Sequence, residues 1–211
     1  MEFIKAGSLL LSFSVLGVIA YLLWLKYLKP KPFGMANGIT LGRNFLVALI
    51  ANLIIFDYGS FETLVIFGLA VTVLLMDGLD GYAARRLGIS SEFGARFDME
   101  SDALFILVLC LGIIVQFDAP LWVLLIGAMR YVYVFAQKAF DPLKLPVKDR
   151  YSRKVICVVQ VIALTLPFSG MATKDVWLWI VLVSLMLLIF SFGRDIMDQL
   201  KEYSGDHHEA I

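Results

Sequence analysis

The sequence predicts an all-α fold, a bundle of helices that crosses a lipid bilayer several times. Nonpolar residues make up 60% of the 211 residues, and the mean hydropathy is +0.84, whereas soluble domains are nearer half nonpolar. These residues also gather into long runs separated by short polar segments, and a helix of roughly 20 nonpolar residues spans the hydrocarbon core of a bilayer. The length fits a single membrane domain.

The first nonpolar run covers residues 8–28 and is expected to be a retained transmembrane helix. A cleaved signal peptide is the rival interpretation, but the run is long for one and no small-residue cleavage site follows it. Pro30 and Pro32 would end the helix. We expect an N-terminal transmembrane helix and basic linker at residues 1–34, the main membrane domain at 35–200 and a polar tail at 201–211.

Three helices are predicted in the first half of the main domain. Asn37 or Thr40 is a suitable N-cap for a helix over residues 41–56. A second helix starts near Glu62 and continues through several polar residues to Arg86, because nonpolar residues extend its pattern. A loop at residues 87–94 with glycines near both ends then leads to a third helix over residues 95–117.

Three more helices follow, over residues 121–140, 154–168 and 176–192. A polar loop with two prolines separates the first two of these helices, and the chain beyond the last one is polar. Cys110 and Cys157 both lie inside nonpolar runs, so we interpret them as small buried side chains and not as a disulfide or a metal pair.

The basic residues predict the orientation of the helices. Fifteen of the 18 lysines and arginines fall on one side of the expected bundle, Lys5 and Lys174 fall on the other, and Arg130 lies inside a helix. Cytoplasmic loops carry the excess of basic residues in membrane proteins. The richer side is therefore expected to be cytoplasmic, which puts the C-terminal tail in the cytoplasm.

Four aspartates at the cytoplasmic ends of two predicted helices form the most informative pattern. They lie three or four residues apart in two pairs, so that each pair shares one helical face; they are Asp77, Asp80, Asp98 and Asp102. Carboxylates near a membrane are costly and usually functional. Magnesium prefers oxygen ligands and often shares its shell with phosphates, and two such ions can clamp a phosphoryl group.

The residues beside the aspartates point to a diphosphate substrate. Gly78 and Gly81 would let a ligand approach the backbone, and Arg85 lies four residues after Gly81, where its guanidinium can pair with a phosphate. Ordinary ion pairs at helix ends would explain one pair of aspartates, but two pairs with glycines and an arginine favour a metal-dependent site. A membrane prenyltransferase also uses aspartates, magnesium and a diphosphate, and a non-enzymatic transporter could relay ions through carboxylates.

The spacing of this segment resembles that of the CDP-alcohol phosphotransferase (CDP-alcohol phosphatidyltransferase) family. The family pattern D-x2-D-G-x2-A-R-x8-G-x3-D-x3-D is matched at every fixed position and every gap between Asp77 and Asp102. The segment from Asn37 to Thr40 is similar to the family's Asn-x-x-Thr. The six predicted helices after residue 40 resemble the family's core, whereas the helix at residues 8–28 departs from it.

The resemblance implies a reaction and a role for each matched residue. Asp77, Asp80 and Asp98 would bind Mg²⁺ or Mn²⁺, as two ions, while Asp102 would be the catalytic base and an additional ligand. An alcohol would attack the phosphorus of a CDP-alcohol, such as CDP-diacylglycerol, and release CMP in phospholipid biosynthesis. The resemblance implies that the CDP-alcohol is contacted by Asn37, Thr40, Gly81, Arg85 and Ser91.

The acceptor alcohol is less well defined by the sequence. Arg130 lies inside a predicted helix, and Arg150 and Arg153 precede the next one; together these arginines are expected to bind a phosphate on the acceptor, such as glycerol phosphate or inositol phosphate. A buried guanidinium is costly when unpaired, so Arg130 is alternatively the structural partner of an acidic residue such as Glu100. Family members are often homodimers, and no nucleic acid partner is expected.

Overall fold

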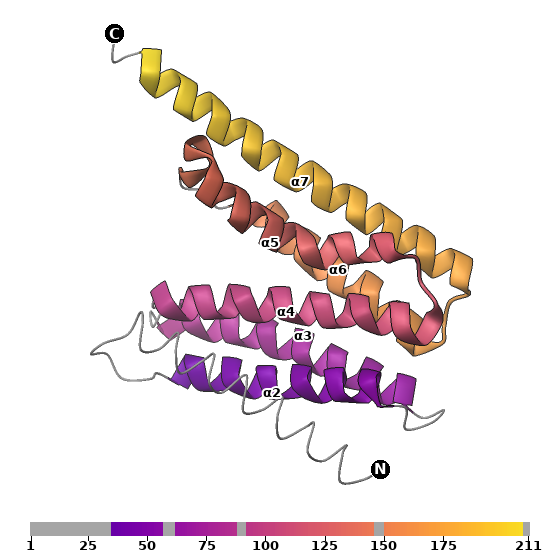
Figure 1. The fold of residues 1–211 in the computed structure, drawn as a ribbon. Coiled ribbons are helices and arrows are strands. Elements are labelled where there is room, and N and C mark those ends of the chain that lie inside the picture. Colours follow the sequence, from indigo (N-terminus) through magenta and orange to yellow (C-terminus); the bar gives the residue numbers. More distant parts are fainter. Residues whose placement is uncertain (1–34, 57–61, 88–91, 146–149, 209–211) are drawn as a thin grey trace.

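A computed structural model describes residues 35–56, 62–87, 92–145 and 150–208. Within these residues the chain is entirely helical, as predicted (Figure 1). The predicted helix at residues 8–28 lies outside the described residues. The α-helices are α2 (Met35–Ile55), α3 (Glu62–Leu87), α4 (Glu92–Phe117), α5 (Leu124–Ala139), α6 (Tyr151–Ser169) and α7 (Lys174–His208), and the 3-10 helices are η1 (Leu121–Val123) and η2 (Asp141–Lys144).

Several of these helices suit a bilayer. By length and composition, three segments of the described chain are able to cross a membrane, and a shorter nonpolar helix covers Thr40–Ile55. The three segments are Asp98–Phe117, Tyr151–Ser169 and Lys174–Ser204. The protein is therefore an integral membrane protein of the multi-helix type that the composition predicts.

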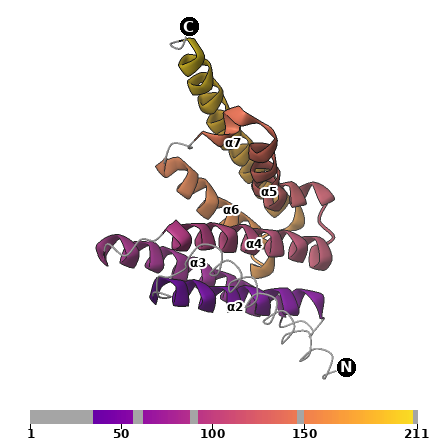
Figure 2. The same cartoon turned by 60° about the vertical axis from the view of Figure 1, so that its left-hand side comes forward.

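Four helices form a closed ring around the centre of the bundle. In the described part of the chain α2 packs against both α3 and α4, α6 packs against the same two helices, and α3 and α4 make no close backbone contact with each other. Helix α5 packs on the outside of α4, and α7 packs on the outside of α6. Figures 1 and 2 show α2, α3 and α4 grouped together, with α7 inclined away from them.

The ring is filled by one fully buried cluster of nonpolar side chains. Ile50 of α2, Ile66 of α3, Leu109 of α4 and Leu164 of α6 are each 0% exposed and belong to the same cluster. Lipid tails are as nonpolar as these side chains, so close van der Waals packing and not the avoidance of water holds the helices together. The cluster therefore fixes the position of all four helices of the ring.

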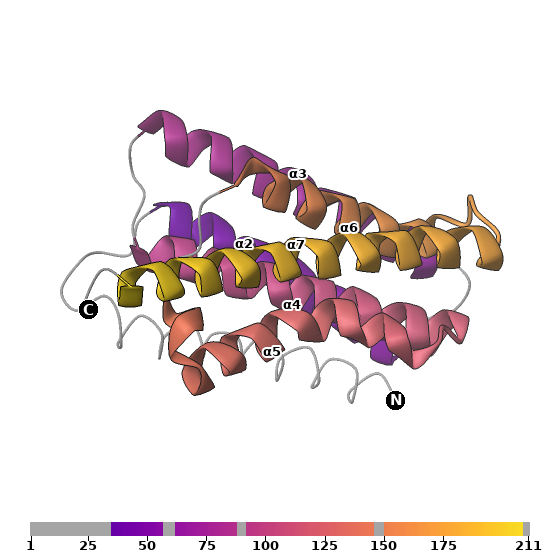
Figure 3. The same cartoon turned by 90° about the horizontal axis from the view of Figure 1, so that it is seen from above.

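The helix boundaries correct several predictions. Helix α2 begins at Met35, so Asn37 and Thr40 lie inside it and neither caps it. Helices α4 and α6 begin at Glu92 and Tyr151, each three residues before the predicted start. Helix α7 continues to His208, so the polar segment expected as a tail is helical over most of its length. At 1.5 Å per residue α7 is roughly 52 Å long, and Figure 3 shows it running along the whole bundle.

Candidate functional site

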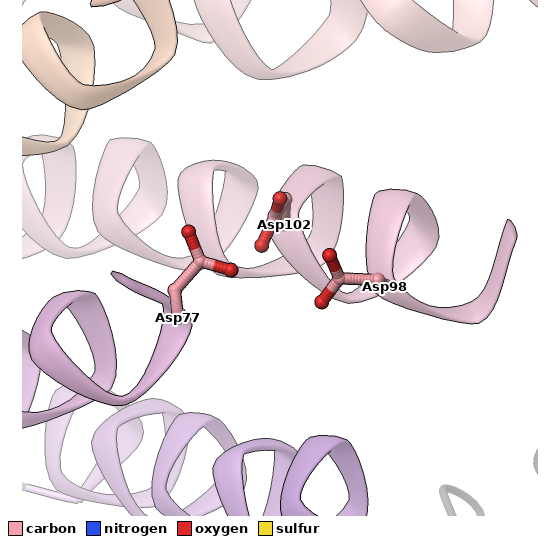
Figure 4. A group of neighbouring side chains, drawn as sticks. All are labelled: Asp77, Asp98 and Asp102. Atoms are coloured by element: carbon pink, nitrogen blue, oxygen red, sulfur yellow. The ribbon is translucent and has the colours of Figure 1, made fainter. Parts of the chain in front are cut away.

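Three of the four predicted aspartates meet at one end of the ring. Asp77 comes from the C-terminal half of α3, and Asp98 and Asp102 lie one turn apart near the start of α4. Figure 4 shows the Asp77 carboxylate pointing from its own helix toward the other two. One oxygen from each carboxylate lies within 4.8 Å of the others, close enough together for the three to hold a metal ion.

The remaining motif residues are described only in part. Asp80, Gly81 and Arg85 lie in the last turns of α3, as the predicted extension of that helix requires, and Asn37 lies in the first turn of α2. Their side chains are outside the described part of the structure, and Ser91 lies outside the described residues. Thr40 is only 4% exposed and lies on α2 one turn before the aspartate-facing part of that helix.

Arg43 is a central residue of the site that the sequence analysis did not identify. Its Nη2 atom lies 2.6 Å from Asp98 Oδ1 and 3.0 Å from Asp102 Oδ1, and its Nη1 atom donates to Asp77. The arginine reaches all three carboxylates because α2 lies against both α3 and α4. The sequence offers one signal, an arginine near the start of a long nonpolar helix, but this residue also fits the general excess of basic residues on that side of the bundle.

Arg43 is buried while its partners remain accessible. The arginine side chain is 2% exposed, whereas those of Asp77, Asp98 and Asp102 are 36%, 43% and 32% exposed. The guanidinium therefore lies beneath the carboxylates, on the protein side, and each carboxylate keeps a surface that a ligand can reach. The three carboxylates and one guanidinium carry a net charge of two negative units, which attracts a divalent cation.

A buried hydrogen bond holds α2 against α4 beside this group. Asn44 Nδ2 donates to Ser101 Oγ over 2.7 Å, and both side chains are at most 5% exposed. Asn44 follows Arg43 and Ser101 precedes Asp102, so the bond fixes the two helices next to the ion pairs. The Oδ1 atom of Asn44 is buried without a hydrogen-bond partner.

The three arginines predicted for the acceptor each pair with a carboxylate. Arg130 Nη2 of α5 donates to Glu100 Oε1 over 2.8 Å, the structural partner that the sequence suggested as an alternative. Glu100 lies between Asp98 and Asp102, so Arg130 reaches the start of α4 close to the aspartates. The Nε atom of Arg130 is nevertheless buried with no hydrogen-bond partner.

Arg150 and Arg153 are held by α7. Arg150 pairs with Asp198, and Arg153 Nη1 lies 3.7 Å from Asp195 Oδ2. Neither partner is predictable from the sequence, because a helix start and a distant polar segment give no local sign that they meet. The three arginines thus lie on two different helix contacts, α5 with α4 and the start of α6 with α7.

Comparisons with known proteins agree with the geometry. A protein-family model described as CDP-alcohol phosphatidyltransferase matches residues 33–190. The CDP-diacylglycerol--glycerol-3-phosphate 3-phosphatidyltransferase of Bacillus subtilis (strain 168) is 33% identical to this chain over 110 residues, which cover 46% of this chain and 56% of that protein. The chain therefore spans about half the length of the curated relative that it matches.

Proposed function

The chain belongs to the CDP-alcohol phosphatidyltransferase family, and we propose that it transfers a phosphatidyl group from CDP-diacylglycerol to an alcohol, with release of CMP, in phospholipid synthesis. The observation that carries this proposal is the cluster of Asp77, Asp98 and Asp102, which joins the two ends of the family's motif within 4.8 Å. Family membership also argues against the prenyltransferase and transporter alternatives.

The donor set fits a divalent metal ion. Carboxylate oxygens are the ligands that Mg²⁺ and Mn²⁺ prefer, and the accessible faces of Asp77, Asp98 and Asp102 are available for coordination. Asp80 lies one turn after Asp77 on α3 and would complete the set. One or two bound ions would neutralise negative charge on the diphosphate of the donor.

The residues of the chain then supply positioning and proton transfer. The CDP part of the donor would be held by Asn37 and Thr40 of α2, by Gly81 and Arg85 of α3, and by Ser91. The acceptor hydroxyl oxygen forms a bond to the phosphorus that carries diacylglycerol, and the bond from this phosphorus to CMP breaks. Asp102 takes the hydroxyl proton, and CMP leaves with the electron pair. Holding both reactants in line supplies much of the acceleration.

A phosphorylated alcohol such as glycerol phosphate is the proposed acceptor. The name of the Bacillus subtilis relative specifies glycerol 3-phosphate for that protein. Arg130 supports the same class here, because its Nε atom is buried without a partner and its guanidinium lies beside the start of α4. Arg150 and Arg153 would also bind the acceptor phosphate if it replaces their contacts with Asp198 and Asp195. The excess of basic residues on the same side of the bundle supports a site on the cytoplasmic face.

CMP release measures the proposed reaction directly. Purified protein with CDP-diacylglycerol, Mg²⁺ and glycerol 3-phosphate should release CMP. Asp102→Asn should reduce the rate by at least about 10²-fold, the usual contribution of general acid–base catalysis, and Asp98→Asn should also reduce it because a proposed metal ligand is lost. Asp118→Asn is the matched control, because Asp118 is exposed at the opposite end of α4 and asparagine also accepts its positive φ of 50°. Full turnover by both variants of the site would refute the mechanism.

A further inference from the structure

Arg43 occupies the position from which a single cation reaches all three carboxylates. One nitrogen lies within 3.0 Å of both Asp98 and Asp102, and the other bonds Asp77. A guanidinium presents its donors in a rigid planar fork, so one arginine can satisfy several carboxylates at once. Arg43 is therefore the internal counter-charge of the aspartate cluster.

The packing around Arg43 keeps the guanidinium at this depth. Its side chain is 2% exposed, and the next residue, Asn44, is bonded to Ser101 of α4. An arginine buried with carboxylates is costly to leave unpaired, and three carboxylates that lose their shared cation repel one another. The ion pairs therefore add a polar link between α3 and α4 through α2 to the packing that α2 and α6 already make with both helices.

The same contacts oppose the binding of a divalent ion. A metal held by Asp98 and Asp102 would lie within a few ångströms of a guanidinium that bonds an oxygen of each. Two cations this close repel each other, and the repulsion is strong where bulk water is excluded. Coordination through the accessible oxygens of these carboxylates therefore becomes more favourable when Arg43 gives up some of its hydrogen bonds to them.

We propose that Arg43 is a built-in competitor of the catalytic metal, so that metal binding is an exchange in which the guanidinium releases Asp98 and Asp102. The inference rests on the proposed function, in which these aspartates are metal ligands. It assigns Arg43 as a positioning residue that lowers metal affinity and stabilises the protein when metal is removed. An arginine that helps to recruit the metal would have the opposite effect on affinity.

Mn²⁺ binding without substrate tests the exchange. The full-length protein, purified in detergent and stripped of metal with a chelator, is titrated with Mn²⁺ while free Mn²⁺ is followed by electron paramagnetic resonance. Thermal unfolding is measured with and without Mn²⁺. The variants are Arg43→Gln, which keeps hydrogen-bonding capacity without charge, and Arg43→Lys, which keeps a charge that contacts fewer carboxylates. Arg194→Gln is the control, because Arg194 is a half-buried arginine bonded to Ser152 on another helix pair.

Arg43→Gln should bind Mn²⁺ about tenfold more tightly than the wild type, because a neighbouring positive charge is removed. Its stripped form should melt at a lower temperature than the stripped wild type, and Mn²⁺ should raise its melting temperature by more. The Mn²⁺ affinity and the melting temperatures of Arg43→Lys should change in the same direction by smaller amounts. Arg194→Gln should keep the wild-type Mn²⁺ affinity.

Unchanged or weaker Mn²⁺ binding in both Arg43 variants would overturn the inference. If Arg43→Gln does not fold, Arg43→Lys decides alone, since tighter binding supports the exchange and equal or weaker binding refutes it. A wild-type protein that binds Mn²⁺ and releases CMP, with no gain in the variants, refutes only the role of Arg43. If neither the wild type nor Arg43→Gln binds Mn²⁺, the proposed metal site and the inference are refuted together.

Discussion

Replacing Gly127 with alanine should loosen the contact between α5 and α4. A Cβ atom at this position would lie 2.9 Å from the Leu107 Cα atom and 2.9 Å from its Cδ1 atom, whereas ordinary van der Waals contacts begin at 3.4 Å. The Leu107 Cα atom belongs to the backbone and cannot rotate away, so α5 must move out by roughly 0.5 Å along much of the contact. Overpacking of this kind costs about 1–3 kcal/mol.

The displacement should also reach the candidate site. Gly127 precedes Arg130 by one turn of α5, so a shift of α5 moves the guanidinium relative to Glu100, its partner at 2.8 Å. We expect the free energy of unfolding of Gly127→Ala to fall by about 1–3 kcal/mol. The KM for glycerol 3-phosphate should rise, while the KM for the CDP-alcohol changes little.

Gly68→Ala provides a matched control in the same assays. A Cβ atom on Gly68 of α3 would meet nothing within 4 Å, and alanine has the higher helix propensity. Its stability should equal or exceed that of the wild type in equilibrium unfolding by denaturant in detergent. If Gly127→Ala is as stable as Gly68→Ala, the close approach of α5 to α4 is not an energetic constraint and the reasoning is wrong.

Two further substitutions test the acceptor site and the buried bond beside the aspartates. Arg130→Ala should raise the KM for glycerol 3-phosphate about 10- to 100-fold, which corresponds to the loss of one hydrogen bond to a charged group. The control Lys138→Ala changes an exposed residue on the same helix and should leave this KM unchanged. A rise confined to the KM of the donor would contradict the assignment of Arg130 to the acceptor. Ser101→Ala should lower the free energy of unfolding by about 1–3 kcal/mol because it leaves the buried Asn44 amide nitrogen unpaired. The control Ser204→Ala removes only an exposed hydrogen bond and should be neutral in the same unfolding measurement.

The error at the start of α2 has a physical cause. Asn37 and Thr40 favour capping positions, but that preference is worth only about 1 kcal/mol. Thr40 is instead buried at 4% exposure inside the helix, where packing of α2 against α3 and α4 outweighs the local preference. Helix ends are decided by such small differences, so a single sequence locates them poorly.

Local sequence patterns predict the helical fold, the spacing of the aspartates and the continuation of α3 past Asp77 to Arg86, one residue before its end at Leu87. These features are local, because hydrophobic runs and helical periodicity depend on neighbouring residues. Helix packing, in contrast, brings α2 against both α3 and α4, so that Arg43 of α2 bonds Asp77, Asp98 and Asp102. Contacts between residues 34 to 59 positions apart follow from helix packing, which no local pattern encodes.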